Sequence, residues 1–205
     1  MEKPKFKIGM TASEVLAEIL RIHPEIESLL FHTYIPHLNK KELNKNHHFD
    51  LWELLWHTPP QQLLKLKRNE IAPENLNRFI SSVGKHKVLA IMSEVKIKED
   101  FFHIPMMDFD CQEKPENMEK IEEFLYRYAW KPGVILSSGR SYHYYGAVLI
   151  PEKEQFRFLG RCILFTGYTD ERYIGHRLID GHGTLRITGT ETGIRPKTPT
   201  VVSVL

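Results

Sequence analysis

Residues 101–110 read FFHIPMMDFD, an apolar run that ends in two acidic residues, Asp108 and Asp110. The pattern predicts a β-strand that leaves a hydrophobic core, although Pro105 indicates an edge or a bulge. Because side chains alternate along a strand, the two carboxylates would share one face, roughly 7 Å apart. Carboxylates this close repel each other unless a cation lies between them. Unless the pair simply marks a surface strand, the stretch predicts a site for a hard divalent ion such as Mg²⁺ or Mn²⁺.

A second polar segment, SSGRSYH at residues 137–143, follows another apolar run. Ser141 and His143 would lie on one face of a strand, with Arg140 on the other face or at a bend. Gly139 favours a turn or bulge, where the backbone can approach a ligand closely. On its own, a histidine in such a strand is more often a structural residue. Beside a metal ion, the serine, arginine and histidine together indicate a phosphate-bearing substrate.

Two further polar residues occur at predicted element boundaries nearer the C-terminus. Asp170 follows a predicted strand at 160–165 and opens a predicted helix at 170–179. The position is typical of a helix N-cap, and it also suits a third carboxylate for a site with two other aspartates. Arg186 lies inside a predicted strand at 184–188, where a charge ordinarily marks the solvent face of a sheet.

The rest of the chain predicts an α+β fold in which a helical N-terminal part precedes a mixed or antiparallel sheet. The hydrophobic period is helical over residues 1–84 and becomes strand-like in residues 85–205, which we take as a separate core. Helices are predicted to begin at the capping box Thr11-x-x-Glu14, at Pro24, at Asp50 and at Pro73, with a mobile loop at 39–48. Behind them we predict strands at 88–97, 101–110, 133–137, 142–150, 160–165, 184–188 and 199–205, helices at 116–130 and 170–179, and a turn at 151–154.

Composition narrows the classes of protein that this chain can be. Its 205 residues, 41% of them hydrophobic, suit one large domain or a core with a small helical attachment. No stretch approaches the roughly 20 apolar residues of a membrane span, and the charged start, MEKPKFKIGM, does not resemble a secretory signal. Two distant cysteines argue against a disulfide framework or a cysteine-based zinc site. The expected compartment is a reducing cytoplasm.

Taken in order, these segments resemble the archaeo-eukaryotic primase superfamily, which includes small primase subunits and primase-polymerases. Its catalytic core has an acidic D-x-D or D-x-E motif, then S-x-H, then a later aspartate after an apolar strand. Here the same order is Asp108-x-Asp110, Ser141-x-His143, Asp170 and the Leu185-Arg186 pair. The resemblance covers roughly residues 86–190. It implies an RRM-like sheet joined to a second αβ unit.

The resemblance also implies roles for the site residues. Three carboxylates match the acidic motifs and would hold Mg²⁺ or Mn²⁺: Asp108, Asp110 and Asp170. Four polar residues would contact the triphosphate of the incoming nucleotide: Arg140, Ser141, His143 and Arg186. The implied activity is metal-dependent synthesis on a single-stranded DNA or RNA template from nucleoside triphosphates. A helicase or other replication proteins are the implied partners.

One departure from the family pattern leaves other functions open. Primase-polymerases commonly carry a lysine after the Leu-Arg strand, whereas residues 189–193 read GTETG. Arg195 or Lys197 would have to substitute for it. A relative that binds nucleotide or nucleic acid without polymerising is therefore an alternative. A metal-dependent phosphohydrolase or nuclease, which could use the same residue types, is another.

Overall fold

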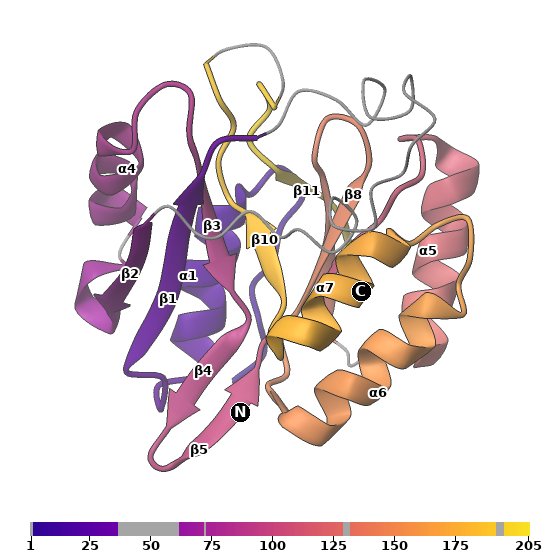
Figure 1. Ribbon diagram of the computed structural model, residues 1–205, viewed down its shortest axis with the longest axis horizontal. Coiled ribbons are helices and arrows are strands. Elements are labelled where there is room, and N and C mark those ends of the chain that lie inside the picture. The colour runs from indigo at the N-terminus through magenta and orange to yellow at the C-terminus, as the bar shows by residue number, and fades with distance from the viewer. Residues whose placement is uncertain (1, 37–61, 72, 129–131, 192–194) are drawn as a thin grey trace.

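The computed structural model describes residues 2–36, 62–71, 73–128, 132–191 and 195–205. Within these ranges the chain forms three antiparallel sheets accompanied by helices (Figure 1). The predicted α+β class is therefore confirmed. The helix expected from Asp50 and the loop expected at 39–48 lie outside the described residues.

The N-terminal sheet has the strand order β10–β3–β1–β2 and contributes to the larger of two hydrophobic cores. Helix α1 packs against it through Leu16 and Ile19, which join Phe31 and Ile91 of the strands in that core. The elements of this part are α1 (Ala12–Ile22), β1 (Ser28–Tyr34), β2 (Gln62–Lys67), the 3₁₀ turn η1 (Arg68–Glu70), α4 (Pro73–Ser82), β3 (Val88–Met92) and β10 (Thr184–Arg186).

The C-terminal sheet has the order β11–β7–β8–β6, and three helices gather on its side of the molecule (Figure 1). A second core, which includes Phe109, Ile135, Tyr144 and Phe158, joins this sheet to helices α5 and α6. A small third sheet, β4–β5–β9, completes the fold. The elements are β4 (Glu94–Ile97), β5 (Asp100–His103), β6 (Met106–Asp108), α5 (Pro115–Tyr128), β7 (Gly133–Ser137), β8 (Tyr142–Gly146), β9 (Ile150–Pro151), α6 (Glu152–Ile163), α7 (Glu171–Asp180) and β11 (Thr200–Val204).

The predicted element types are wrong in two parts of the chain, after Pro24 and over residues 151–165. The segment after Pro24 forms strand β1 instead of a helix, because it pairs on both sides with β2 and β3 and buries Phe31 in the core. The predicted strand at 160–165 and the predicted turn at 151–154 fall mostly in helix α6. The buried residues of this helix recur at helical spacing, as expected when one helix face packs on a core: Gln155, Phe158, Leu159 and Cys162.

The N-terminal sheet takes strands from both sides of residue 84. Strands β1 and β2 come from the first part of the chain, whereas β3 and β10 come from the second. The first part is thus built from helices and strands together, and it contributes directly to the sheet that carries Arg186. The division between residues 1–84 and a catalytic core at 85–205 stays a prediction about function.

His103 is a buried titratable group at the end of β5. Its Nδ1 lies 3.1 Å from the Ser93 hydroxyl, which in turn accepts a hydrogen bond from the Gly183 amide at 2.7 Å. Burial lowers the pKa of His103 to about 4, and the nearby His182 lowers it further. Burial also lowers the pKa of His182, which lies in the field of Arg177 and Asp180. His103 is therefore neutral in the folded protein at neutral pH.

This burial predicts a loss of stability in mild acid. The unfolded chain takes up a proton on His103 near pH 6.5, whereas the folded chain does so only near pH 4. Stability contributed by neutral His103 should therefore be full above pH 6.5 and should fall, on the order of 3 kcal/mol in all, as the pH drops to 4. Urea unfolding at pH 7.5 and 4.5 measures this loss. His103→Gln should remove most of it, and His86→Gln, at an exposed histidine, should not. Equal slopes in wild type and His103→Gln would contradict the assignment.

Candidate functional site

A short antiparallel contact brings the acidic segments together. Phe109 forms an isolated bridge with Thr169. On either side of it, the Asp170 amide donates to the Asp108 carbonyl at 3.2 Å and the Asp110 amide donates to the Tyr168 carbonyl at 2.8 Å. Because side chains alternate along each segment, Asp108 and Asp170 lie opposite each other on the face away from Phe109. Asp110, two residues beyond Asp108, shares that face.

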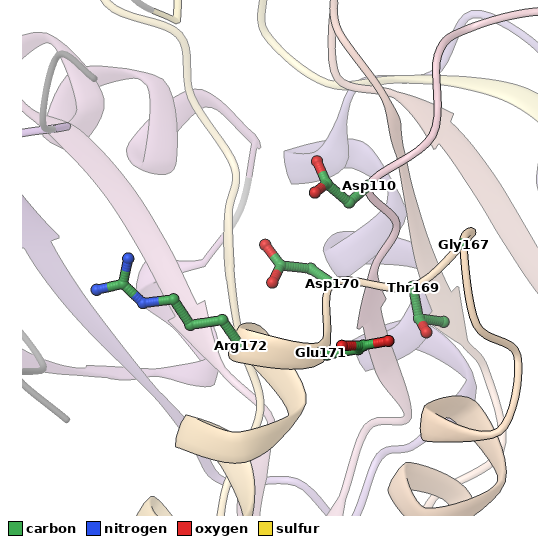
Figure 2. Close-up of a pocket in the computed structure, with 6 residues that line it drawn as sticks. All are labelled: Asp110, Gly167, Thr169, Asp170, Glu171 and Arg172. Atoms are coloured by element: carbon green, nitrogen blue, oxygen red, sulfur yellow. The ribbon is translucent and has the colours of Figure 1, made fainter. Parts of the chain in front are cut away.

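A pocket of about 310 Å³ opens beside two of these carboxylates. In Figure 2 the side chains of Asp110, Asp170 and Arg172 point toward the same side, with Arg172 reaching farthest, and that of Glu171 points the opposite way. The volume is at the lower end of the range for small-ligand sites. The residues that line the pocket are Asp110, Gly167, Thr169, Asp170, Glu171 and Arg172.

Asp108 does not line this pocket, and its surroundings disfavour the ionised carboxylate. Burial is the largest cause that raises its pKa, to about 7, although its side chain keeps 32% of its solvent exposure. The carboxylate of Asp170, and more weakly that of Asp110, raises the pKa further, whereas Arg195 and Arg186 lower it. Burial and the two carboxylates together outweigh the two arginines, so the ionised form of Asp108 is disfavoured.

Asp170 is the N-cap of helix α7. Its Oδ1 accepts a hydrogen bond from the Tyr173 amide at 3.0 Å, as an N-cap side chain does. The ordinary interpretation of this residue is therefore confirmed. The cap also fixes the carboxylate at the pocket, so the structural bond and a ligand-binding role are compatible.

Ser141 and His143 both face the acidic segment from β8 and the loop before it. His143 pairs with Asp108 across β6 and β8, and its Nε2 lies 3.5 Å from Asp108 Oδ1. Burial, with Arg186 and Arg195, holds the pKa of His143 well below its ordinary value, so the imidazole is neutral at pH 7. Its buried Nδ1 has no hydrogen-bond partner among the residues that the structure describes. The Ser141 hydroxyl donates to the Phe109 carbonyl and so ties its loop to the acidic segment.

Arg186 is buried beneath this face. Its guanidinium donates to the carbonyls of Thr188 at 2.8 Å and Lys197 at 2.7 Å, and also to the carbonyl of Ser138. The donors that a phosphate contact would use are largely engaged by the main chain. The charge of Arg186 still acts on the site, since it lowers the pKa values of Asp108 and His143. Arg140, by contrast, is exposed at the bend after Gly139.

Three cations and one acid complete the surroundings. Arg195 is half-buried and lies close enough to lower the pKa values of Asp108 and His143. Lys197 instead donates to the Ser137 hydroxyl at 2.5 Å and lies 3.9 Å from Glu113. Sequence reasoning named Arg195 and Lys197 as substitutes for the missing lysine and did not single out Arg172 or Glu113. Arg172 could have been found from the sequence, because it lies two residues after the motif residue Asp170. Glu113 lies outside every motif, so its position in the sequence offered no reason to select it.

The donor set suits a hard cation, but the ligands are not drawn together. Three carboxylates on one face have the chemistry that binds Mg²⁺ or Mn²⁺, and the pKa of Asp108 is raised by burial and by the carboxylates of Asp170 and Asp110. Within the described residues, no three histidine, cysteine or acidic side chains lie close enough to hold a metal ion. The close convergence expected from the sequence is therefore not seen in this arrangement.

Among the residues that the structure describes, no helix has the length and apolar character needed to cross a bilayer.

An antiparallel α+β fold with an acidic strand end facing an S-x-H strand defines a protein of the archaeo-eukaryotic primase class. The sequence model of the AEP-like family, described as archaeo-eukaryotic primase 1D-like, matches residues 67–200, about two thirds of the chain. The chain belongs to this family. The resemblance read from the motifs is thereby confirmed, and the matched range extends beyond both ends of the 86–190 segment. Comparisons with curated proteins and with solved structures gave no match.

Proposed function

We propose that this protein is a nucleotidyltransferase of the primase-polymerase type. It would join nucleoside triphosphates on a single-stranded DNA or RNA template with Mg²⁺ or Mn²⁺. The observation that carries most weight is the placement of Asp108, Asp110 and Asp170 on one face, in a member of a primase family. The raised pKa of Asp108 adds support, because strongly shifted carboxyl groups at a pocket are typical of functional sites.

The roles of the acidic residues and their neighbours follow from their contacts. The three carboxylates would hold the divalent ions, which stabilise charge on the attacking hydroxyl and the α-phosphate in an in-line displacement. His143 is neutral and lies against Asp108, so it would orient that carboxylate without repelling a cation. Ser141 holds the loop and the acidic segment in register through the Phe109 carbonyl.

The triphosphate needs cations with accessible donors. Arg195 and Arg140 are the proposed contacts to the triphosphate. The charge of Arg195 already acts on Asp108 and His143, and Arg140 is exposed in the loop that precedes β8. Planar guanidinium groups bind phosphate oxygens in a bidentate manner and would neutralise the leaving pyrophosphate. Arg186 would contribute its charge from beneath. Single-stranded nucleic acid as ligand, a helicase or other replication protein as partner, and a cytoplasmic location remain predictions.

A second function, nucleotide or nucleic-acid binding without polymerisation, is favoured by one observation. Arg186, which the family resemblance assigned to phosphate, donates to three main-chain carbonyls instead. With the family lysine also missing, the site has fewer free cations for a leaving pyrophosphate than the motif order alone indicated. Such a protein would bind nucleoside triphosphate and release no product.

A primer-synthesis assay separates these functions. The protein is incubated with single-stranded DNA, Mn²⁺ and labelled nucleoside triphosphates, and products are resolved by length. Extended products support the polymerase. A rise in melting temperature with nucleotide but without extension would leave the binder, and release of phosphate or of nucleoside monophosphate without extension would identify a hydrolase.

Arg195→Ala should weaken nucleotide binding more than it slows the chemical step. Loss of a charge-assisted contact to phosphate is expected to raise KM for nucleoside triphosphate about tenfold or more, with a smaller change in kcat. Arg195→Lys should recover part of the loss. Steady-state incorporation kinetics measure this split, and Arg157→Ala, at an exposed arginine on α6, is the matched control. Unchanged KM in Arg195→Ala would remove Arg195 from the site.

A further inference from the structure

The loop between β7 and β8 carries Arg140, one of the two proposed triphosphate contacts, and includes a glycine with positive φ. Gly139 has a φ of +93°, in the left-handed region that residues other than glycine rarely adopt. The loop is closed by a hydrogen bond of 2.8 Å from the Ser138 amide to the Ser141 carbonyl. In this conformation Arg140 is exposed and Ser141 is buried.

Glu113, which belongs to no family motif, holds this loop from outside. Its Oε1 accepts hydrogen bonds from the Ser137 hydroxyl at 2.6 Å and from the Gly139 amide at 2.8 Å. The acceptor is a carboxylate, so both bonds are charge-assisted and stronger than neutral ones. Glu113 lies two residues before helix α5, which anchors the acid relative to the C-terminal sheet.

Lys197 adds to the same cluster. Its Nζ donates to the Ser137 hydroxyl at 2.5 Å, and that hydroxyl donates a hydrogen bond to Glu113, so it is used as both acceptor and donor. The ammonium also lies 3.9 Å from Glu113 Oε2. A Cβ on residue 139 would approach the Cβ of Lys197 to 3.0 Å, which shows how closely this side chain packs on the loop.

We propose that Glu113 is a positioning residue of the nucleotide site, acting with Lys197 to fix the loop that presents Arg140 and Ser141 and leads into the strand of His143. This inference rests on the proposed function. It gives Lys197 a task in shaping the loop and leaves Arg195 as the substitute for the family lysine. Without the carboxylate, the Gly139 amide and the Ser137 hydroxyl lose their acceptor, the Lys197 ammonium loses its ion-pair partner, and the loop loses the contact that selects its conformation.

The experiment compares Glu113→Ala, Glu113→Gln, Lys197→Met and the double variant Glu113→Ala/Lys197→Met in the full chain. We expect Glu113→Ala to raise the Kd and KM for nucleoside triphosphate about tenfold, while the Mn²⁺ concentration for half-maximal activity stays unchanged. Glu113→Gln retains an acceptor and should stay within about threefold of wild type. The double variant should be no worse than Glu113→Ala, because the two residues act through one loop. Amide hydrogen exchange at residues 138–141 should accelerate in Glu113→Ala.

Controls separate the possible failures. Glu119→Ala removes an exposed acid from helix α5 and should change neither nucleotide affinity nor exchange in the loop. If Glu113→Ala binds nucleotide as wild type does and only melts earlier, Glu113 has a purely structural role and the inference is overturned. If loop exchange is unchanged, it is overturned as well. If the wild-type protein neither binds nor incorporates nucleotide, the proposed function fails, and the inference fails with it. That outcome is read from the wild-type protein alone, without any variant.

Discussion

Replacing Asp108 by asparagine should reduce metal-dependent nucleotide incorporation roughly a thousandfold or more, equivalent to about 4 kcal/mol of lost transition-state stabilisation. The amide keeps the shape of the side chain but removes the charge that a hard cation needs. Asp108 occupies the centre of the acidic face, opposite Asp170 and 3.5 Å from His143. Single-turnover incorporation with saturating Mn²⁺ measures the loss directly.

The same substitution should not destabilise the metal-free protein. The ionised Asp108 is disfavoured by burial and by the carboxylates of Asp170 and Asp110, so its pKa is raised to about 7. The unfolded chain gives up that proton near pH 4 and the folded chain only near pH 7, so the stability contributed by protonated Asp108 falls as the pH rises from about 4 to about 7 and is fully lost above 7. At pH 8 the melting temperature of Asp108→Asn should equal or exceed that of wild type. A site that sacrifices stability for function has this signature.

Two comparisons make the Asp108 result specific. Asp170→Asn should lose activity to a similar extent, since asparagine retains the N-cap of α7 but not the charge. Asp100→Asn, at an exposed acid on β5, should change neither activity nor stability. Activity retained in Asp108→Asn would exclude Asp108 as a metal ligand, and a large fall in melting temperature would identify a structural role instead.

Local signals predicted those elements that local chemistry controls. The capping box at Thr11 and Glu14 begins α1 where expected, with the Thr11 amide donating to Glu14 at 2.7 Å. Helix α5, predicted at 116–130, spans Pro115–Tyr128, and the strand predicted at 133–137 is β7. The helix prediction after Pro24 is wrong because pairing with the neighbouring strands β2 and β3 determines the secondary structure of this segment. The periodicity of seven residues carries no information about a pairing partner.

The site divides in the same way. Alternation along a strand was enough to place Asp108 and Asp110 on one face, and the cap position of Asp170 was legible beside it. The contacts of Arg186 and Glu113 were not legible, because they join residues far apart in sequence through main-chain carbonyls and an amide. The residue type shows that an arginine is able to bind phosphate. Only the folded structure shows that main-chain carbonyls already accept hydrogen bonds from its guanidinium group.

Substitution of Arg186 is therefore expected to have a second large effect. The result distinguishes a structural role, in which Arg186 binds main-chain carbonyls, from direct binding of phosphate. Arg186→Met should lower the free energy of unfolding by about 3 kcal/mol, because it leaves several buried carbonyls without donors. The affected acceptors are the carbonyls of Ser138, Thr188 and Lys197. Nucleotide affinity should fall too, since Ser138 begins the loop that presents Ser141 and His143. Urea unfolding and nucleotide titration on the same preparation measure both losses.

Arg186→Lys is the discriminating variant. Lysine keeps the positive charge that acts on Asp108 and His143 but lacks the planar fork that reaches separate carbonyls, so a positioning role predicts that stability and nucleotide affinity both fall. A direct phosphate contact predicts the reverse pattern: Arg186→Lys would retain most of the binding, and Arg186→Met would lose binding with wild-type stability. Because the two roles differ in the stability of the nucleotide-free protein, unfolding measurements decide between them even if polymerase activity is never detected.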